Sequence, residues 1–334
     1  MQRSPQLSDL PEPPAGTEGW PWTETPPSYE WSGLEPPRVT VVTPSLDQAA
    51  YLEQTIRSVL LQGYPNLEYI VVDGGSSDGS VEIIRRYEPW LAHWVSEPDE
   101  GQAHAINKGF LRSTGDILAW LNSDDFYAPG AVALVARHLT RPDCSVAVGH
   151  CLRIHSSGKP PRLLRGRFAG RRRLLAFWEG YEMHQPSIFW TRDAFERTGL
   201  LDEEVGDIFD FDYWVRLSRY CHFENIDSVL SCSNYHPAAK TGDDYKRYHR
   251  ELWRRRRAYA GSRRGSLFWA LELSAAWHRV ERPLRSRAGR LLQLDPDRSA
   301  PAVSADLLER LGVARSQAPR ADPKTAGARR GSPQ

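Results

Sequence analysis

Apolar and polar positions in the central part of the chain follow two alternating periods. The β-branched run Arg38 to Thr43 predicts a strand, and apolar residues spaced by three and four from Leu52 to Leu60 predict a helix over residues 49–61. Further strands are expected at residues 67–72, 93–95, 117–121 and 145–149, and further helices after Asp78 up to Tyr87 and at residues 102–111 and 130–139. Such alternation predicts an α/β fold with a mainly parallel central sheet and helices on both faces.

Ligands of a parallel α/β sheet collect at the carboxyl ends of its strands. Three of the loops there carry a carboxylate, namely residues 43–48, 73–75 and 122–125. The loop at residues 43–48 contains no glycine, which disfavours the GxGxxG turn of a nicotinamide or flavin site. A GxxxxGK[ST] phosphate loop is absent from the whole sequence, which argues against the common nucleoside triphosphatases.

Asp124 and Asp125 are adjacent carboxylates directly after the apolar run at residues 117–121. Such a pair suits a hard divalent cation, Mg²⁺ or Mn²⁺, which prefers oxygen ligands and few protein donors. A cation held there could bind a diphosphate. Paired acids in a turn also occur as a solvated loop or a helix cap, so the pattern alone leaves both interpretations open.

Both ends of the chain differ in composition from its centre. Residues 1–37 hold nine of the 25 prolines, which predicts an extended arm. Its large aromatic side chains are costly to expose, so we expect the arm to lie along the domain that follows; they are Trp20, Trp22, Tyr29 and Trp31. A domain is expected over residues 38–249, a basic amphipathic helical segment over residues 250–293, and a flexible tail over residues 294–334.

The overall charge offers little attraction for nucleic acid. The 43 Lys and Arg residues balance 42 Asp and Glu residues, and no recognised nucleic-acid-binding module accompanies the local basic clusters, so we expect no nucleic-acid partner. No apolar run approaches the length of a bilayer crossing, and the N-terminal residues lack a secretory signal. The four cysteines form no CxxC pair and suit reduced thiols in a cytosol, so we expect a cytoplasmic protein.

The basic residues are unevenly distributed. Arg250 to Arg290 contains twelve Arg and three Glu, interspersed with large apolar residues such as Leu267 and Trp269. This pattern can be explained by a helix whose basic face is solvated. Two functional interpretations are also possible. One is peripheral contact with an anionic membrane surface, which the apolar residues favour, and the other is contact with an acidic acceptor.

Several separated segments resemble one family in order along the chain. VTVVTPSLDQAAYLEQTIRSVLLQGYPNLEYIVVDGGSSDGSVEII, SEPDEGQAHAINKGF and GDILAWLNSDDFYAPGA are similar to the nucleotide-sugar half of the family 2 inverting glycosyltransferases, which have the GT-A fold. The resemblance covers about residues 38–240, with a nucleotide-sugar half over residues 38–150 and an acceptor half over residues 151–249.

The resemblance implies roles for the residues at the strand ends. Thr43 and Pro44 would contact the nucleobase, Asp73 would hydrogen-bond it, and Asp124 and Asp125 would hold the metal, the ribose and the diphosphate. This chain departs from the family at Asn122, where relatives often have aspartate, and at Leu46-Asp47, where relatives commonly have an aromatic residue and Asn.

The segment at residues 100–109 also resembles the donor-binding stretch of the family. Gln102, Asn107 and Lys108 supply amides and a cation that would meet the donor sugar and its phosphates. The other interpretation is an exposed amphipathic helix with Lys108 in solvent.

In the acceptor half, the resemblance continues at residues 184–189, 199–203 and 210–217. Asp210 takes the position of the catalytic base, a carboxylate that would remove the proton of the attacking acceptor hydroxyl, and Asp212 is the competing candidate. In the segment from Tyr235 to Gly242, His236 would ligate the metal or bond a phosphate oxygen, and Lys240 would add charge near the leaving group. The alternative is that both are ordinary surface-loop residues.

The resemblance implies a metal-dependent inverting glycosyltransferase with Mn²⁺ or Mg²⁺ as cofactor. Its donor would be a nucleoside-diphosphate sugar, UDP-linked, and its acceptor a hydroxyl-bearing saccharide or lipid-linked molecule in polysaccharide or glycolipid biosynthesis. Two other classes stay open. One is a sugar nucleotidyltransferase, which ordinarily has a glycine-rich basic loop after the first strand, and the other is a carbohydrate- or lipid-binding scaffold without activity.

Overall fold

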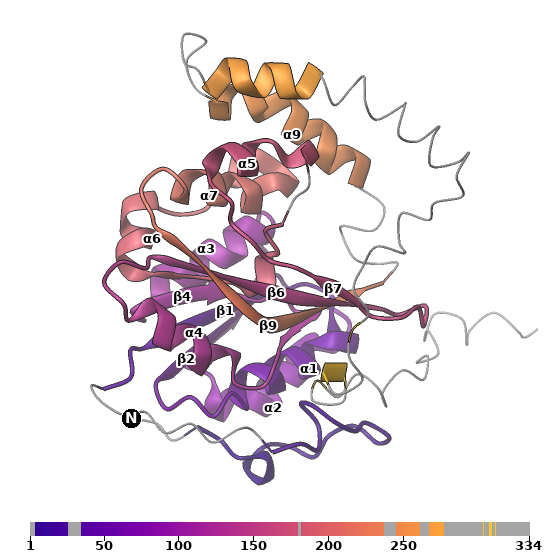
Figure 1. Ribbon diagram of the computed structural model, residues 1–334. Coiled ribbons are helices and arrows are strands. Elements are labelled where there is room, and N and C mark those ends of the chain that lie inside the picture. The colour runs from indigo at the N-terminus through magenta and orange to yellow at the C-terminus, as the bar shows by residue number, and fades with distance from the viewer. Residues whose placement is uncertain are drawn as a thin grey trace, which may run out of the picture.

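A computed structural model describes residues 4–25, 35–179, 182–236, 245–260 and 267–276, together with Val303, Leu307, Leu308 and Leu311. Its centre is a twisted β-sheet between two layers of helices (Figure 1). In the described residues the sheet has nine strands, ordered β3-β2-β1-β4-β8-β6-β9-β5, and β7 pairs with β6 outside this order. The strands are β1 (Val39–Ser45), β2 (Leu67–Asp73), β3 (His93–Ser96), β4 (Ile117–Trp120), β5 (Asp125–Tyr127), β6 (Val146–His155), β7 (Arg162–Leu164), β8 (Ile188–Thr191) and β9 (Phe223–Tyr235).

The sheet is mostly parallel. Strands β1 to β4 run in one direction, β8 is antiparallel to both β4 and β6, and β6 and β9 are again parallel to each other. Short β5 and β7 are antiparallel to their partners. The predicted α/β fold with a mainly parallel sheet is therefore confirmed.

Helices cover both faces of the sheet and divide the core into two clusters. One cluster lies under α1 (Ala49–Leu60), α2 (Ser80–Tyr87) and α4 (Ala131–Leu139). The other lies under α3 (Gln102–Arg112), α5 (Arg171–Leu175), α6 (Arg192–Thr198), α7 (Phe209–Leu217) and α9 (Tyr245–Ala260). The 3-10 helices are η1 (Leu7–Asp9), η2 (Glu88–Trp90), η3 (Phe177–Glu179), η4 (Gln185–Ser187) and η5 (Glu203–Ile208).

The sequence explains why β1 and α3 pack so closely. All seven residues of β1 are buried, as expected for a parallel strand with helices on both faces. Helix α3 places Ala103, Ile106 and Phe110 on its buried face. At Gly109 a β-carbon would lie 2.4 Å from Val42 Cγ1, so glycine lets α3 approach the sheet at this point.

Two strands differ from the elements expected from the sequence. The strand expected at residues 145–149 extends to His155, because its second half pairs with β9. Asp125, expected in the same loop as Asp124, begins β5 and pairs with Ser233. Such a pairing brings together residues far apart in the chain, and a three-residue strand leaves no periodicity to detect.

An aromatic cluster supports α7 on the sheet. The rings of Trp120 and Trp214 stack with their centroids 5.3 Å apart, and Trp190 meets both at steep angles. All three tryptophans are buried. Such densely packed rings hold the middle of α7 in one position relative to the end of β4.

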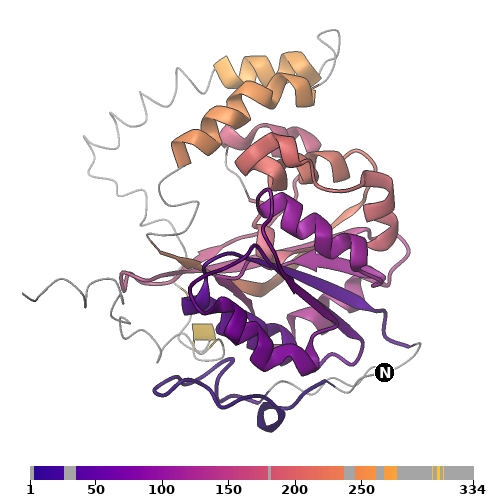
Figure 2. The same cartoon turned by 180° about the vertical axis from the view of Figure 1, so that it is seen from behind.

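The N-terminal and C-terminal segments both pack on this domain. Residues 4–25, here called the arm, lie on the α1 and α2 side (Figure 2), with Trp20 and Trp22 buried. Tyr29 and Trp31 lie outside the described residues, as do most residues of the expected tail. Helix α9 crosses the domain boundary expected at residue 249 and stacks Trp253 on Trp178, with ring centroids 4.9 Å apart.

Candidate active site

Asp73 is the last residue of β2, and its side chain is fully buried. Its Oδ2 accepts hydrogen bonds from the backbone N–H groups of Gly75 at 3.1 Å and Ser76 at 2.9 Å, and from Ser96 Oγ at 2.7 Å. Its Oδ1 accepts a hydrogen bond from Ser76 Oγ. Asp73 therefore shapes the turn after β2 and joins it to β3, and Oδ1 retains capacity for a further donor.

Thr43 and Pro44, expected at the nucleobase, lie inside β1. Thr43 is fully buried, and its Oγ1 accepts a hydrogen bond from the Tyr69 hydroxyl at 3.0 Å. The residues exposed just beyond them are Leu46 and Asp47, and Asp47 Oδ1 accepts a hydrogen bond from Ser77 N at 2.9 Å. The loops after β1 and β2 are thus joined into one surface, while the nucleobase role of Thr43 and Pro44 stays a prediction.

Helix α3 connects the two neighbouring strand ends. Gln102 Nε2 donates to Asn122 Oδ1 at 2.8 Å, which joins the start of α3 to the loop after β4. Lys108 Nζ forms an ion pair with Glu97 Oε1 at 2.8 Å, and Glu97 N donates to the Asp73 carbonyl at 3.0 Å. Asn122 therefore has a defined partner here.

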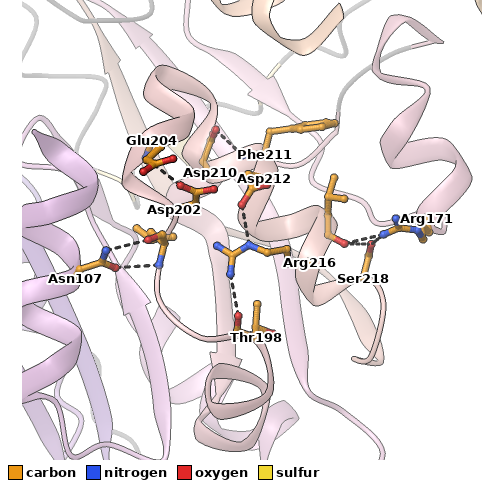
Figure 3. A network of polar contacts seen from close by, with 12 residues as sticks. Asn107, Arg171, Thr198, Asp202, Glu204, Asp210, Phe211, Asp212, Arg216 and Ser218 are labelled. Atoms are coloured by element: carbon orange, nitrogen blue, oxygen red, sulfur yellow. Dashed lines mark hydrogen bonds and ion pairs between the residues drawn. The ribbon is translucent and has the colours of Figure 1, made fainter. Parts of the chain in front are cut away.

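Asn107 connects α3 to the acceptor half. Its side-chain amide donates to the Leu201 carbonyl at 3.0 Å, and its Oδ1 accepts from Leu201 N at 2.9 Å (Figure 3). The amide also donates to Glu203 Oε1 at 2.6 Å. These bonds hold the segment that leads into η5 and α7. The expected contact of Asn107 and Lys108 with the donor stays a prediction, since both side chains have protein partners.

Asp124 and His236 are far apart in the sequence, but their side chains are in contact in the structure. Their Oδ2 and Nε2 atoms lie 3.3 Å apart, and the His236 ring stacks on Tyr51 of α1 with centroids 4.4 Å apart. His236 is almost fully buried, whereas the Asp124 side chain keeps 22% of its exposure. A carboxylate and an imidazole so placed offer one oxygen and one nitrogen to a divalent cation. Lys240, expected near the leaving group, lies outside the described residues.

Asp125 has surroundings unlike those of Asp124. Its carboxyl group is buried beside the hydroxyl of Ser233 and the backbone N–H of Asn234, with Arg153 as a nearby positive charge. Burial and the adjacent Asp124 charge raise the pKa of Asp125 well above its ordinary value. Asp125 therefore anchors the loop in β5, and its role as a metal ligand stays a prediction.

Asp210 and Asp212 both lie in the first turn of α7 but have different partners (Figure 3). Asp212 Oδ2 accepts a hydrogen bond from Arg216 Nε at 2.7 Å, and Arg216 also donates to the Thr198 carbonyl. Asp210 Oδ1 accepts a hydrogen bond from Phe211 N at 2.6 Å. Burial raises the pKa of Asp210 to about 6. A half-buried carboxyl group with a pKa near neutrality is suited to general-base catalysis, while Asp212 is held in an ion pair.

Sequence reasoning missed two further contributors to this region. Tyr248 of α9 lies with its hydroxyl 3.4 Å from Asp210 Oδ1, although it stands outside every recognised motif. Asn234 Nδ2 donates to the Asp124 carbonyl at 2.8 Å. Asn234 could have been suspected from the sequence because it lies two residues before His236. Nothing in the sequence indicated a role for Tyr248.

A second group of potential ligands lies between α3 and η5. The ligand atoms of Glu100, His104 and Glu203 all lie within 4.8 Å of one another. His104 Nδ1 accepts a hydrogen bond from Glu100 N at 2.9 Å, so Nε2 is the ring nitrogen that could bind a metal ion. Both glutamates are exposed, a common arrangement in the absence of any ion.

Two solved structures have the same architecture. Mannosyltransferase PcManGT from Pyrobaculum calidifontis, in complex with GDP-Man and Mn²⁺, matches with a TM-score of 0.54 and 20% identity, covering 88% of each chain. S. aureus TarS in complex with UDP-GlcNAc matches with a TM-score of 0.55 and 14% identity, covering 78% of this chain and 77% of that one. The fold is therefore that of the GT-A glycosyltransferases.

Sequence comparison gives the family. The model for glycosyl transferase family 2 matches residues 40–199, and these residues therefore belong to glycosyltransferase family 2. An uncharacterized glycosyltransferase of Mycobacterium tuberculosis is 41% identical over 106 residues, 31% of this chain and 40% of the relative. A putative teichuronic acid biosynthesis glycosyltransferase of Bacillus subtilis is 42% identical over 92 residues, 27% of this chain and 36% of the relative. The chain thus spans less than half the length of these relatives.

Within the described part of the chain, no helix combines the length and apolar character that a bilayer crossing requires.

Proposed function

We propose that this protein is a metal-dependent inverting glycosyltransferase. It transfers a sugar from a nucleoside-diphosphate donor, UDP-linked, to a hydroxyl group of a saccharide or lipid-linked acceptor in polysaccharide or glycolipid biosynthesis. The observation that carries the proposal is the position of α3. Gln102 bonds to the loop after β4 and Asn107 to the segment leading to α7, while Lys108 pairs with Glu97, whose backbone N–H bonds to the end of β2. Helix α3 thus bonds to segments close in sequence to Asp124 and Asp210 and, through Glu97, to Asp73.

Asp124 and His236 fit a divalent cation, Mn²⁺ or Mg²⁺. Their ligand atoms are 3.3 Å apart, and the stacking on Tyr51 fixes the imidazole ring. A bound cation would neutralise charge on the departing diphosphate. Asp125 and Asn234 support this site by holding the backbone around Asp124. Asp73 binds the nucleobase, which requires the turn after β2 to move because the carboxylate is fully buried, and Gln102 and Lys108 line the donor side.

Asp210 removes the proton from the acceptor hydroxyl as the new glycosidic bond forms. A pKa of about 6 leaves the carboxyl group ionised at neutral pH and still basic enough to accept that proton. Attack on the anomeric carbon from the side opposite to the diphosphate inverts its configuration. Asp212 is unsuited to this role because its carboxylate is paired with Arg216.

We also propose a cytoplasmic location with peripheral contact to an anionic membrane. The helix over residues 267–276 exposes Trp269 and Leu273, four residues apart and 58% and 70% exposed. Arg254 and Arg257 of α9 are exposed as well. Apolar side chains beside cations suit the interface of an anionic bilayer.

The experiment that tests the proposal measures release of nucleoside diphosphate from a panel of UDP-sugars and GDP-mannose, with Mn²⁺ or with EDTA. We expect slow hydrolysis of at least one donor with Mn²⁺, reduced about 100-fold in Asp124→Asn. Asp143→Asn, which changes an exposed carboxylate in another loop, is the matched control and should retain the wild-type rate. If no donor is hydrolysed under any condition, the proposed activity is wrong.

A further inference from the structure

Among the described residues, strand β5, which begins with Asp125, is the last strand of the sheet, and one of its edges has no strand partner there. In an antiparallel pair, alternate residues direct their backbone N–H and C=O groups away from the neighbouring strand. For β5 these residues are Asp125 and Tyr127, whose four backbone groups all bond to partners outside β9. The bonds are Asp125 N to the Asn122 carbonyl, Thr55 Oγ1 to the Asp125 carbonyl, Tyr127 N to Ser58 Oγ, and Trp20 Nε1 to the Tyr127 carbonyl.

Three of the partners are side chains from two elements. Thr55 and Ser58 belong to α1, and Thr55 Oγ1 also donates to the Ser123 carbonyl at 2.9 Å. Trp20 belongs to the arm, and its indole N–H donates to the Tyr127 carbonyl at 2.7 Å. The loop at residues 122–125, here called the acid loop, is therefore held directly by α1, whereas the arm holds the end of β5 that follows it.

The arm is fixed to α1 by a buried cation. Arg57 is fully buried, and its side chain lies 5.5 Å from the centre of the Trp22 ring. Its guanidinium donates to three carbonyls of the arm and to one hydroxyl, namely Pro11 O at 2.8 Å, Pro21 O at 3.2 Å, Trp22 O at 3.3 Å and Tyr87 OH at 3.1 Å. A buried guanidinium without acceptors is costly, so these hydrogen bonds stabilise the packing of the arm on α1.

We propose that Trp20 is a positioning residue for the metal site, and that the arm is an integral part of the catalytic domain. The indole N–H fixes the Tyr127 carbonyl, two residues after Asp125, and so limits how far the acid loop can move. This inference rests on the proposed function in that it assigns Asp124 of the acid loop to the metal.

The test compares Trp20→Phe with Trp22→Phe in the full-length protein. Both variants make the same change in the arm, but only Trp20 uses its indole N–H on β5; the Trp22 ring and carbonyl contact Arg57. We expect amide hydrogen exchange in residues 122–128 to accelerate about five-fold in Trp20→Phe and to match wild type in Trp22→Phe. The Mn²⁺ concentration that half-saturates UDP binding should rise about five-fold in Trp20→Phe alone.

Unchanged exchange in Trp20→Phe, or equal acceleration in both variants, overturns the positioning role. If Trp20→Phe does not fold, a tryptophan analogue with sulfur in place of the indole N–H at residue 20 preserves ring volume and removes the same hydrogen bond. Acceleration of exchange by that analogue supports the role, and unchanged exchange overturns it. A wild-type protein that binds no UDP contradicts the proposed function, while the exchange measurement still decides the role of Trp20.

Discussion

Asp210 and Asp212 show how two neighbouring carboxyl groups acquire different chemistry. The Arg216 side chain neutralises Asp212, while burial raises the pKa of Asp210 to about 6. The base must be ionised to act, so the rate of sugar transfer should fall about tenfold per pH unit below pH 6. A pH profile of kcat/KM measures this limb. Asp212→Asn should keep the limb near pH 6, and a wild-type limb near pH 4 would show that Asp210 is not the base.

The same pKa shift makes Asp210 costly for stability. The folded protein binds the proton more tightly than the unfolded chain, so stability decreases as pH rises from 3.8 to about 6 and stays lower above that range. At pH 8, Asp210→Asn should therefore raise the free energy of unfolding by on the order of 1–2 kcal/mol while abolishing transfer. At pH 4 the gain should vanish. Urea unfolding at both pH values measures the difference, and a destabilised variant at pH 8 would contradict it.

Helix α3 supports the site as an element through Asn107 and Lys108, which are neighbours in sequence. Asn107 is buried and satisfies both backbone groups of Leu201, whereas Lys108 pairs with a Glu97 side chain that is 52% exposed. Asn107→Ala should lower the free energy of unfolding by about 2–3 kcal/mol, because it leaves buried groups unpaired. Lys108→Met should cost less than about 1 kcal/mol. Equal losses in chemical denaturation would show that α3 does not hold the acceptor half in this way.

The helix over residues 267–276 is predicted to contact a membrane surface. If Trp269 and Leu273 enter a membrane interface, the protein should sediment with vesicles containing anionic phosphatidylglycerol, and the double change Trp269→Ser and Leu273→Ser should abolish that binding. Leu111→Ser is the matched control, because Leu111 is 71% exposed on α3. Binding by the wild type that survives the double change would contradict this contact.

At the scale of the whole molecule, the sequence predicted what depends on local pattern. Asp73 and Asp124 were predicted as site residues because each follows an apolar run, and Asp210 because of the motif that it resembles. The separate environments of Asp124 and Asp125 could not be predicted, since they arise from the pairing of β5 with β9. The buried contacts of Arg57 with the arm could not be predicted from the sequence either. Its acceptors lie in a proline-rich segment of the arm, and only the folded chain brings that segment to α1.

In the mechanism proposed here, the acid loop and His236 hold the cation that binds the donor diphosphate, and Asp210 acts separately as the base. Anomalous diffraction from a crystal grown with Mn²⁺ and UDP tests it most directly. We expect a manganese peak between Asp124 and His236, in contact with the diphosphate oxygens. A peak at Glu100, His104 and Glu203 instead, or UDP bound away from Asp73, would contradict it.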